Sequence, residues 1–149
     1  MSKKISVAIL GSTGYVGLEL VKILSKHPNV EIVFLGTENS PDISIQKLDS
    51  SIDITNIPST KLNKDFDCNI ADTVFLALPH NVSHEYVSLY FNKIQIIDLS
   101  ADFRLDDYEI YKKNYGKKHS CPTLLKDFIY GLPEFNRDRL VNCNNIAVP

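Results

Sequence analysis

The chain opens with an unbroken apolar run that is followed by an amphipathic stretch. Residues 5–10, ISVAIL, are short, branched and bounded by glycine, which predicts a buried strand. From Val16 to Leu24 apolar residues recur at helical spacing, and Pro28 is expected to close that helix. A second apolar run, VEIVFLG at 30–36, predicts a second strand.

The same alternation returns in the middle of the chain. The run TVFLALP at 73–79 is continuously hydrophobic, as in strands of parallel sheets that are covered on both faces. The stretch NVSHEYVSLYF predicts a helix capped by Asn81 or Ser83, and IQIIDLS at 94–100 predicts a further strand. The polar stretch 37–72 predicts no more than short strands and a helical turn.

The last third of the chain is rich in loops. A short helix is predicted in DDYEIYKKNY, whereas FIYGLPEF and NNIAVP are predicted to be short extended segments. The repeated order strand, helix, strand is typical of an α/β fold with right-handed parallel connections. We therefore expect a doubly wound, mostly parallel, Rossmann-like sheet that forms one domain over residues 1–149.

Composition and charge narrow the classes of function. Hydrophobic residues make up 44% of the chain and charged residues 23%, as in a folded globular protein. The net charge of −2 comes without a basic stripe, so nucleic acid is not an expected partner. The apolar runs are too short to span a bilayer and there is no signal-peptide pattern, which favours the cytoplasm and no membrane association.

The cysteines predict neither a disulfide framework nor a metal site. Cys68, Cys121 and Cys143 are odd in number and show no paired spacing. His119 and Cys121 lie two residues apart, but no second pair of ligands has the spacing of a zinc site. We therefore expect no bound metal.

Glycines recur at every third position between the first strand and the first helix. In GSTGYVG, Gly11 is suited to a sharp turn, Gly14 to close approach of a pyrophosphate, and Gly17 to tight packing of helix on sheet. Backbone N–H groups and the positive end of the helix dipole would then face an anion. The spacing is GxxGxxG rather than GxGxxG, so a tight turn without a ligand is the alternative.

The end of the second strand is where such folds select their cofactor. Glu38 lies 21 residues after Gly17, and an acidic residue at this distance binds the ribose 2′-hydroxyl of NAD. No arginine that would bind a 2′-phosphate is nearby, although Thr37 and Ser40 have hydroxyl groups that can donate to one. A solvated Glu38 without a ligand is an equal alternative.

Later strand ends carry further candidates. Pro79 ends the third predicted strand and His80 follows it, at the place where the ligand of an open sheet is expected. Arg104 lies among several aspartates after the fourth strand, and its guanidinium is suited to a carboxylate or phosphate. The alternative for Arg104 is a structural pair with Asp102 or Asp107.

Several separated stretches resemble one family. In order and spacing they are similar to the amino-terminal region of N-acetyl-gamma-glutamyl-phosphate reductases. The stretches are ILGSTGYVGLELVKILSKHPNVEI, VFLALPHNVS, IIDLSADFRL, YEIYKKNYG and YGLPEFNR. LSADFRL and YGLPE are the more specific ones, because aspartate-semialdehyde dehydrogenases share the glycine turn and the fold but not these two. The resemblance covers nearly all of the chain except residues 38–72.

The resemblance implies an NADP-dependent enzyme of arginine biosynthesis with a second, α/β substrate domain. It would reduce N-acetyl-γ-glutamyl phosphate to the semialdehyde through a cysteine thioester, assisted by a histidine of the second domain. NNIAVP resembles the opening of the family segment IANPGCYPT, so the catalytic cysteine is expected beyond Pro149. This chain alone is expected to be inactive and could be a monomer, whereas the whole enzyme would be a homo-oligomer.

The resemblance also assigns residues to two groups, and it places no catalytic residue in this chain. The residues that would hold the cofactor are Gly11, Ser12, Thr13, Gly14, Tyr15, Val16, Gly17, Thr37, Glu38, Ser40, Pro79 and His80. The residues that would border the small-molecule substrate are Ser100, Arg104 and Glu134. Where family members often carry a Ser-Arg pair, this chain has TENS at 37–40, which leaves NAD open beside NADP.

Two other functions remain open at this point. One is the related reductase of lysine biosynthesis, which acts on a carrier-linked or one-carbon-longer substrate. The other is a nucleotide-sensing or interaction module that uses a Rossmann fold without chemistry.

Overall fold

The computed structural model describes residues 3–53, 55–116 and 118–149. Its contacts divide into two compact units, Met1–Ala77 and Leu78–Pro149. Each unit combines helices with parallel strands, so the α/β class predicted from the sequence is confirmed.

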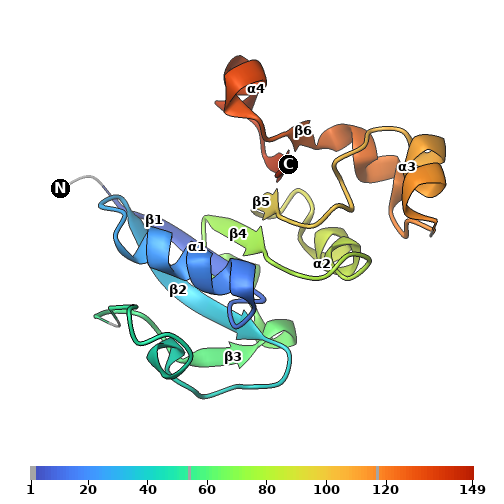
Figure 1. The fold of residues 1–149 in the computed structure, drawn as a ribbon. Coiled ribbons are helices and arrows are strands. Elements are labelled where there is room, and N and C mark those ends of the chain that lie inside the picture. The colour runs from blue at the N-terminus through green and yellow to red at the C-terminus, as the bar shows by residue number, and fades with distance from the viewer. Residues whose placement is uncertain (1–2, 54, 117) are drawn as a thin grey trace. The chain divides into compact units, whose positions relative to one another are not determined.

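The first unit holds the glycine turn. Its strands and helix are, in chain order, β1 (Ile5–Leu10), α1 (Tyr15–Ser25), β2 (Val30–Thr37), β3 (Thr60–Leu62) and β4 (Thr73–Leu76). The strands lie in the order β3-β2-β1-β4, and neighbouring strands are parallel. Figure 1 shows α1 lying across β1 and β2. The elements predicted at both ends of the glycine turn are therefore confirmed.

Strand β1 is buried on both faces. Each residue from Val7 to Leu10 is at most 2% exposed. Val7 and Ile9 belong to the hydrophobic cluster that includes Val21 and Leu24 of α1. This double burial explains why the sequence of β1 is continuously apolar instead of alternating.

The polar stretch after β2 is attached to the same cluster. Ile45 and Ile52 are 1% exposed and pack with the residues of β1 and α1. Between them, the Asp49 carboxylate accepts from the Lys22 ammonium of α1 at 2.6 Å. The stretch contains the short strand β3, as predicted, and single turns of 3-10 helix before and after it.

The contact between Asp49 and Lys22 leads to a prediction of how the stability of the first unit depends on pH. Hydrogen bonds from Lys22 and then from Ser51 lower the pKa of Asp49 from 3.8 to about 2. A lowered pKa means that the carboxylate stabilises the fold above pH 3.8, and that this contribution is lost as the pH falls towards 2. We expect Asp49→Asn to lower the thermal unfolding midpoint at neutral pH and to converge with the wild type in acid. The measurement is thermal unfolding followed by circular dichroism across this pH range.

Asp42 offers a matched control, because its side chain and that of its partner Lys61 are 71% and 55% exposed. An exposed ion pair contributes little, so Asp42→Asn should leave the midpoint unchanged at each pH. The prediction would be contradicted if the unfolding midpoints of Asp49→Asn and the wild type differed by the same amount at every pH.

The second unit contains the remaining elements. They are α2 (Ser83–Tyr90), β5 (Gln95–Asp98), α3 (Tyr108–Tyr115), β6 (Ile129–Tyr130), α4 (Pro133–Leu140) and β7 (Asn145–Ala147). The strands lie in the order β5-β7-β6 and are parallel. The helix predicted in DDYEIYKKNY and the extended segment in NNIAVP are both confirmed, as α3 and β7.

Two local predictions for the second unit are wrong. Neither Asn81 nor Ser83 caps α2, because the cap position is Val82 and no side chain bonds there. Ser83 lies inside the helix, where its hydroxyl is buried beside the Asp98 carboxyl. The segment FIYGLPEF is not wholly extended, since α4 begins at Pro133.

Candidate functional site

The glycine turn has the backbone geometry that its sequence predicts. Gly11 has φ of 78°, a left-handed conformation that favours glycine. Gly14 is the cap residue of α1 and is extended. A Cβ at Gly17 would overlap the Gly11 carbonyl oxygen and would lie 2.7 Å from Ser12 Cα. The roles predicted for Gly11 as the sharp turn and Gly17 as the packing contact are therefore confirmed.

Hydrogen bonds hold the turn from inside the unit. Gly11 N–H donates to Asn63 Oδ1 at 3.1 Å, and Gly14 N–H donates to the Gly11 carbonyl at 3.2 Å. The N–H and the hydroxyl of Ser12 both donate to the Gly36 carbonyl at 2.8 Å. Ser12 is fully buried, and its hydroxyl supports the turn through this bond to Gly36.

The first turn of α1 presents N–H groups that have no acceptor among the described residues. Leu18 N–H makes the first bond of the helix, to the Gly14 carbonyl, and no side chain caps the helix. The first turn also carries no acidic residue that would neutralise the positive end of the dipole. Tyr15 is 93% exposed and Val16 55%, so the surface around these N–H groups is open. This arrangement is suited to a phosphate group.

The carboxyl end of β2 lies beside the glycine turn. Thr37 is buried, and its hydroxyl is 3.0 Å from that of Thr13. Glu38 is exposed and has no salt-bridge partner among the described residues. The Ser40 carbonyl accepts from the Thr60 hydroxyl at 2.6 Å, which fixes the loop after Glu38. The unit thus brings Thr13, Thr37 and Glu38 to one edge of its sheet.

In the second unit, His80 follows Pro79 in an exposed position. Its Nδ1 accepts from the Ala101 N–H at 2.9 Å. In the neutral ring the proton therefore lies on Nε2, which makes that atom a hydrogen-bond donor. The ring of His80 lies 6.4 Å from that of Tyr115.

The segment SADFRL is largely a structural element. Ser100, Asp102 and Phe103 are each at most 2% exposed. The Ser100 hydroxyl donates to Asp98 at 2.8 Å, and burial raises the pKa of that carboxyl. Asp102 accepts from the Asn81 N–H at 2.9 Å, which joins this segment to the start of α2.

Arg104 does not pair with either of its expected structural partners. Its Nε donates to the Val148 carbonyl at 2.8 Å and its Nη2 to the Leu99 carbonyl at 3.2 Å. Asp102 is occupied by Asn81, and Asp107 caps α3 by accepting from the Ile110 N–H at 3.0 Å. The predicted alternative of an Arg104–aspartate pair is therefore wrong. Within the described part of the chain, Arg104 Nη1 has no acceptor.

His119 and Cys121 form a buried structural pair. His119 Nδ1 accepts from the Cys121 N–H at 3.1 Å, while its Nε2 donates to the Asp102 carbonyl at 2.9 Å. Burial, followed by the neighbouring His84, lowers the pKa of His119. The Cys121 thiol donates to the His84 carbonyl at 3.1 Å. The described residues contain no group of three or more potential metal ligands.

Glu134 lies in the first turn of α4 and is exposed. None of the residues of α4 is buried, and Phe135 is 83% exposed. The role expected for Glu134, support of the substrate pocket, stays a prediction.

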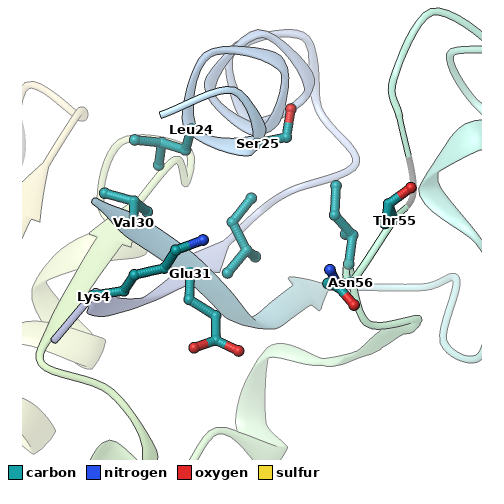
Figure 2. Close-up of a pocket in the computed structure, with 9 residues that line it drawn as sticks. Lys4, Leu24, Ser25, Val30, Glu31, Thr55 and Asn56 are labelled. Carbon is teal, nitrogen blue, oxygen red and sulfur yellow. The ribbon is translucent and has the colours of Figure 1, made fainter. Parts of the chain in front are cut away.

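A pocket of about 410 Å³ opens at the opposite end of the first unit (Figure 2). It is lined by residues at the start of β1 and β2, the end of α1 and the loop before β3, among them Lys4, Leu24, Val30, Thr55 and Asn56. Ligands of open parallel sheets bind beyond the carboxyl ends of the strands. This pocket lies at the amino ends, so it is not the candidate cofactor site.

Two residues that hold the turn were missed by the sequence analysis. Asn63 lies in the polar stretch 37–72, where no pattern distinguishes it from its neighbours. In the sequence, Gly36 is only the last residue of a predicted strand. In the structure, a Cβ at this position would come within 2.8 Å of Leu10 Cδ2 and would overlap Asn63 Oδ1. An isolated glycine in a strand is itself a weak sign of such close approach.

Comparisons with known proteins agree with this geometry. The family described as "Semialdehyde dehydrogenase, NAD binding domain" matches residues 6–143. The chain is 42% identical, over its whole length, to the N-acetyl-gamma-glutamyl-phosphate reductase of Ehrlichia chaffeensis, of which it covers 43%. It is 42% identical to the [LysW]-L-2-aminoadipate/[LysW]-L-glutamate phosphate reductase of Sulfurisphaera tokodaii, with 97% of this chain and 42% of that protein covered.

Solved structures show the same fold. The structure of aspartate semialdehyde dehydrogenase II from Vibrio cholerae with ASA matches with a TM-score of 0.72 and 20% identity, over 99% of this chain and 42% of that one. The enzyme from Candida albicans with NADP matches with a TM-score of 0.58 and 21% identity, over 71% of this chain and 32% of that one. Among the described residues, none of the helices has the length and hydropathy needed to cross a membrane.

The chain thus spans less than half the length of the curated relatives that it matches. The resemblance to N-acetyl-gamma-glutamyl-phosphate reductases, first drawn from short stretches, is confirmed at about 40% identity. The Rossmann-like fold is confirmed as well. On these grounds the chain belongs to the semialdehyde dehydrogenase family, of which it represents the NAD-binding domain.

Proposed function

We propose that this chain binds NADP for a reductase that converts N-acetyl-γ-glutamyl phosphate to N-acetylglutamate semialdehyde. The observation that carries this proposal is the uncapped first turn of α1 behind a glycine turn of fixed geometry. The names of relatives that are about 40% identical to this chain support the substrate class. The proposal extends to a cytoplasmic enzyme of arginine biosynthesis that acts as a homo-oligomer when whole.

The residues of the turn fit a dinucleotide. The N–H groups of Tyr15, Val16 and Gly17 would hold the pyrophosphate, because the helix uses none of them. Gly14 gives the phosphates room, since a Cβ there would meet a single atom, the Gly11 carbonyl oxygen at 3.6 Å. Thr13 would bind the pyrophosphate through its backbone, because its hydroxyl is hydrogen-bonded to that of Thr37. When bound, NADPH supplies a hydride to the substrate.

The second unit would serve the nicotinamide and the acyl phosphate. His80 offers its Nε2–H, since Nδ1 is held by Ala101. Arg104 is fixed by two carbonyls and retains Nη1 as a charged donor for a phosphate or carboxylate group. The Ser100 hydroxyl is engaged with Asp98, so we assign Ser100 to positioning. Pro79 and Glu134 keep the roles that the resemblance implies.

The resemblance implies a catalytic cysteine outside this chain, and the surroundings of two of the chain's own cysteines support that expectation. Cys121 is buried and its thiol donates to a carbonyl, while burial raises the pKa of Cys143. A nucleophilic cysteine requires the opposite, an accessible thiol with a lowered pKa. We therefore expect the 149-residue chain to bind cofactor without reducing acyl phosphates.

The choice between NADP and NAD tests the proposal. We expect calorimetric titration to show tighter binding of NADP⁺ than of NAD⁺. The Glu38 carboxylate would repel a 2′-phosphate, so Glu38→Gln should strengthen NADP⁺ binding about threefold and leave NAD⁺ binding nearly unchanged. Glu31→Gln is the matched control, because Glu31 is the second residue of β2 and lies at the other end of the strand.

Two results would count against this assignment. One is that NAD⁺ binds more tightly than NADP⁺ and that Glu38→Gln weakens the binding of NAD⁺. This result would mean that Glu38 binds the ribose hydroxyl and that the cofactor is NAD. Binding of neither cofactor at millimolar concentration would remove the proposed function itself.

A reductase for carrier-linked substrates is the second candidate. Its support is the 41% and 42% identity to reductases of Pyrococcus horikoshii and Sulfurisphaera tokodaii, whose names refer to LysW-linked 2-aminoadipate and glutamate phosphates. Both candidates share the cofactor site. Assays of the whole enzyme with free and carrier-linked acyl phosphates would separate them.

A further inference from the structure

Asn63 connects the end of β3 to the turn that follows β1. It comes directly after β3, and it is 3% exposed. Its Oδ1 accepts from the Gly11 N–H at 3.1 Å, across 52 residues of sequence. The side chain passes so close to Gly36 of β2 that a Cβ there would overlap Oδ1. Strand β2 therefore carries glycine where Asn63 crosses it.

The turn is consequently fixed by β2 and by the residue that follows β3. Asn63 holds the Gly11 N–H, and the Gly36 carbonyl holds the N–H and the hydroxyl of Ser12. These bonds direct the first N–H groups of the turn into the unit. Those of the first turn of α1, for which the described residues provide no acceptor, remain available to a ligand.

Glycine is the residue with most conformational freedom, so a glycine turn needs external contacts to keep one shape. Gly11 has φ of 78° and its N–H has Asn63 as its acceptor. Without that acceptor, the half-buried Gly11 N–H would have to donate to water instead. The turn would then be free to leave the conformation that exposes the α1 N–H groups. A site that is held in its binding shape beforehand loses less entropy on binding.

We propose that Asn63 is a positioning residue that fixes the glycine turn in its phosphate-binding shape before the cofactor arrives. It acts through Gly11 and not by touching the cofactor. This inference rests on the proposed function, because the phosphates in question are those of the dinucleotide.

The test compares two substitutions of Asn63 in the whole chain. Asn63→Leu has nearly the same shape without the acceptor, and Asn63→Asp retains an acceptor oxygen. We expect Asn63→Leu to accelerate hydrogen exchange of the Gly11 amide about tenfold relative to the Val7 and Ile9 amides of β1, measured by NMR without ligand. We expect Asn63→Asp to preserve the protection of Gly11. The amides of β1 correct for any change in the stability of the unit.

Binding is measured with NADP⁺ and with inorganic pyrophosphate. Asn63→Leu should weaken both about tenfold. Gly36→Ala should do the same, because its methyl group would take the place of Asn63 Oδ1. The proposal would be overturned if Asn63→Leu left the exchange rate of the Gly11 amide unchanged relative to the β1 amides. It would also be overturned if the Gly11 amide lost its protection while the affinity for NADP⁺ and pyrophosphate stayed the same.

The proposed function can fail separately from this inference. If the wild type binds pyrophosphate but neither NADP⁺ nor NAD⁺, the cofactor assignment is wrong, and Gly11 exchange together with pyrophosphate affinity still decides the role of Asn63. If the wild type binds none of the three, the glycine turn is not a phosphate site and both proposals fall.

Discussion

Gly17→Ala is expected to destabilise the first unit by about 3 kcal/mol, at the upper end of the cost of overpacking. The new Cβ would overlap the Gly11 carbonyl oxygen and would lie 2.7 Å and 2.8 Å from Ser12 Cα and carbonyl carbon. All of these are backbone atoms, which cannot rotate away as a flexible side chain can. Helix α1 would have to move off the sheet, and the turn would move with it.

Gly14→Ala is the control for this substitution. Its Cβ would meet the Gly11 carbonyl oxygen at 3.6 Å, an ordinary contact, and its φ of −78° suits any residue. Urea unfolding followed by circular dichroism should therefore separate the two alanine variants by more than 2 kcal/mol. Equal stability of the two would show that α1 does not pack on the turn as described.

Phe103→Ala is expected to have a comparable effect on the second unit, about 4 kcal/mol. Phe103 is 2% exposed and stacks on Phe128, with the ring centroids 4.1 Å apart. Its ring is also nearly perpendicular to that of His119, with the ring centroids 4.8 Å apart. The substitution would leave a cavity next to the histidine that holds the Asp102 carbonyl. Because Arg104 is the next residue, the loss should also release its guanidinium from the Val148 carbonyl.

Phe135→Ala provides the matched control, because this phenylalanine is 83% exposed. Its cost should stay within about 0.5 kcal/mol. Thermal unfolding of both variants, together with proteolysis of the segment around Arg104, measures the difference. A small effect of Phe103→Ala would mean that SADFRL is not a core segment, and its residues would again be free for direct substrate contact.

The elements that the sequence predicted well are those with a strong local pattern. Strands β1 and β2 are short apolar runs next to glycine, and α1 has apolar residues at helical spacing that enter one cluster. Helix α4 was missed because none of its residues is buried, so it has no apolar face for periodicity to reveal. Its proline at the first turn was the remaining signal.

The local geometry of the glycine turn was predictable from the sequence, but the contacts that support the turn were not. The spacing of Gly11 and Gly17 follows from local geometry at one turn. By contrast, Asn63 reaches Gly11 across 52 residues, and only the pairing of β2 with β3 brings them together. Arg104 bonds to carbonyl groups, which every residue carries, so sequence could not identify its partners.

The uncapped start of α1 also has a practical consequence for work with this protein. N–H groups at the positive end of a helix take up any small anion, since binding there depends on charge and not on the rest of the molecule. If the cofactor binds as proposed, sulfate or phosphate in a buffer is expected to compete with it at the first turn of α1. Affinities for the cofactor measured in such buffers are expected to be too weak, so a buffer of low anion concentration is the suitable medium.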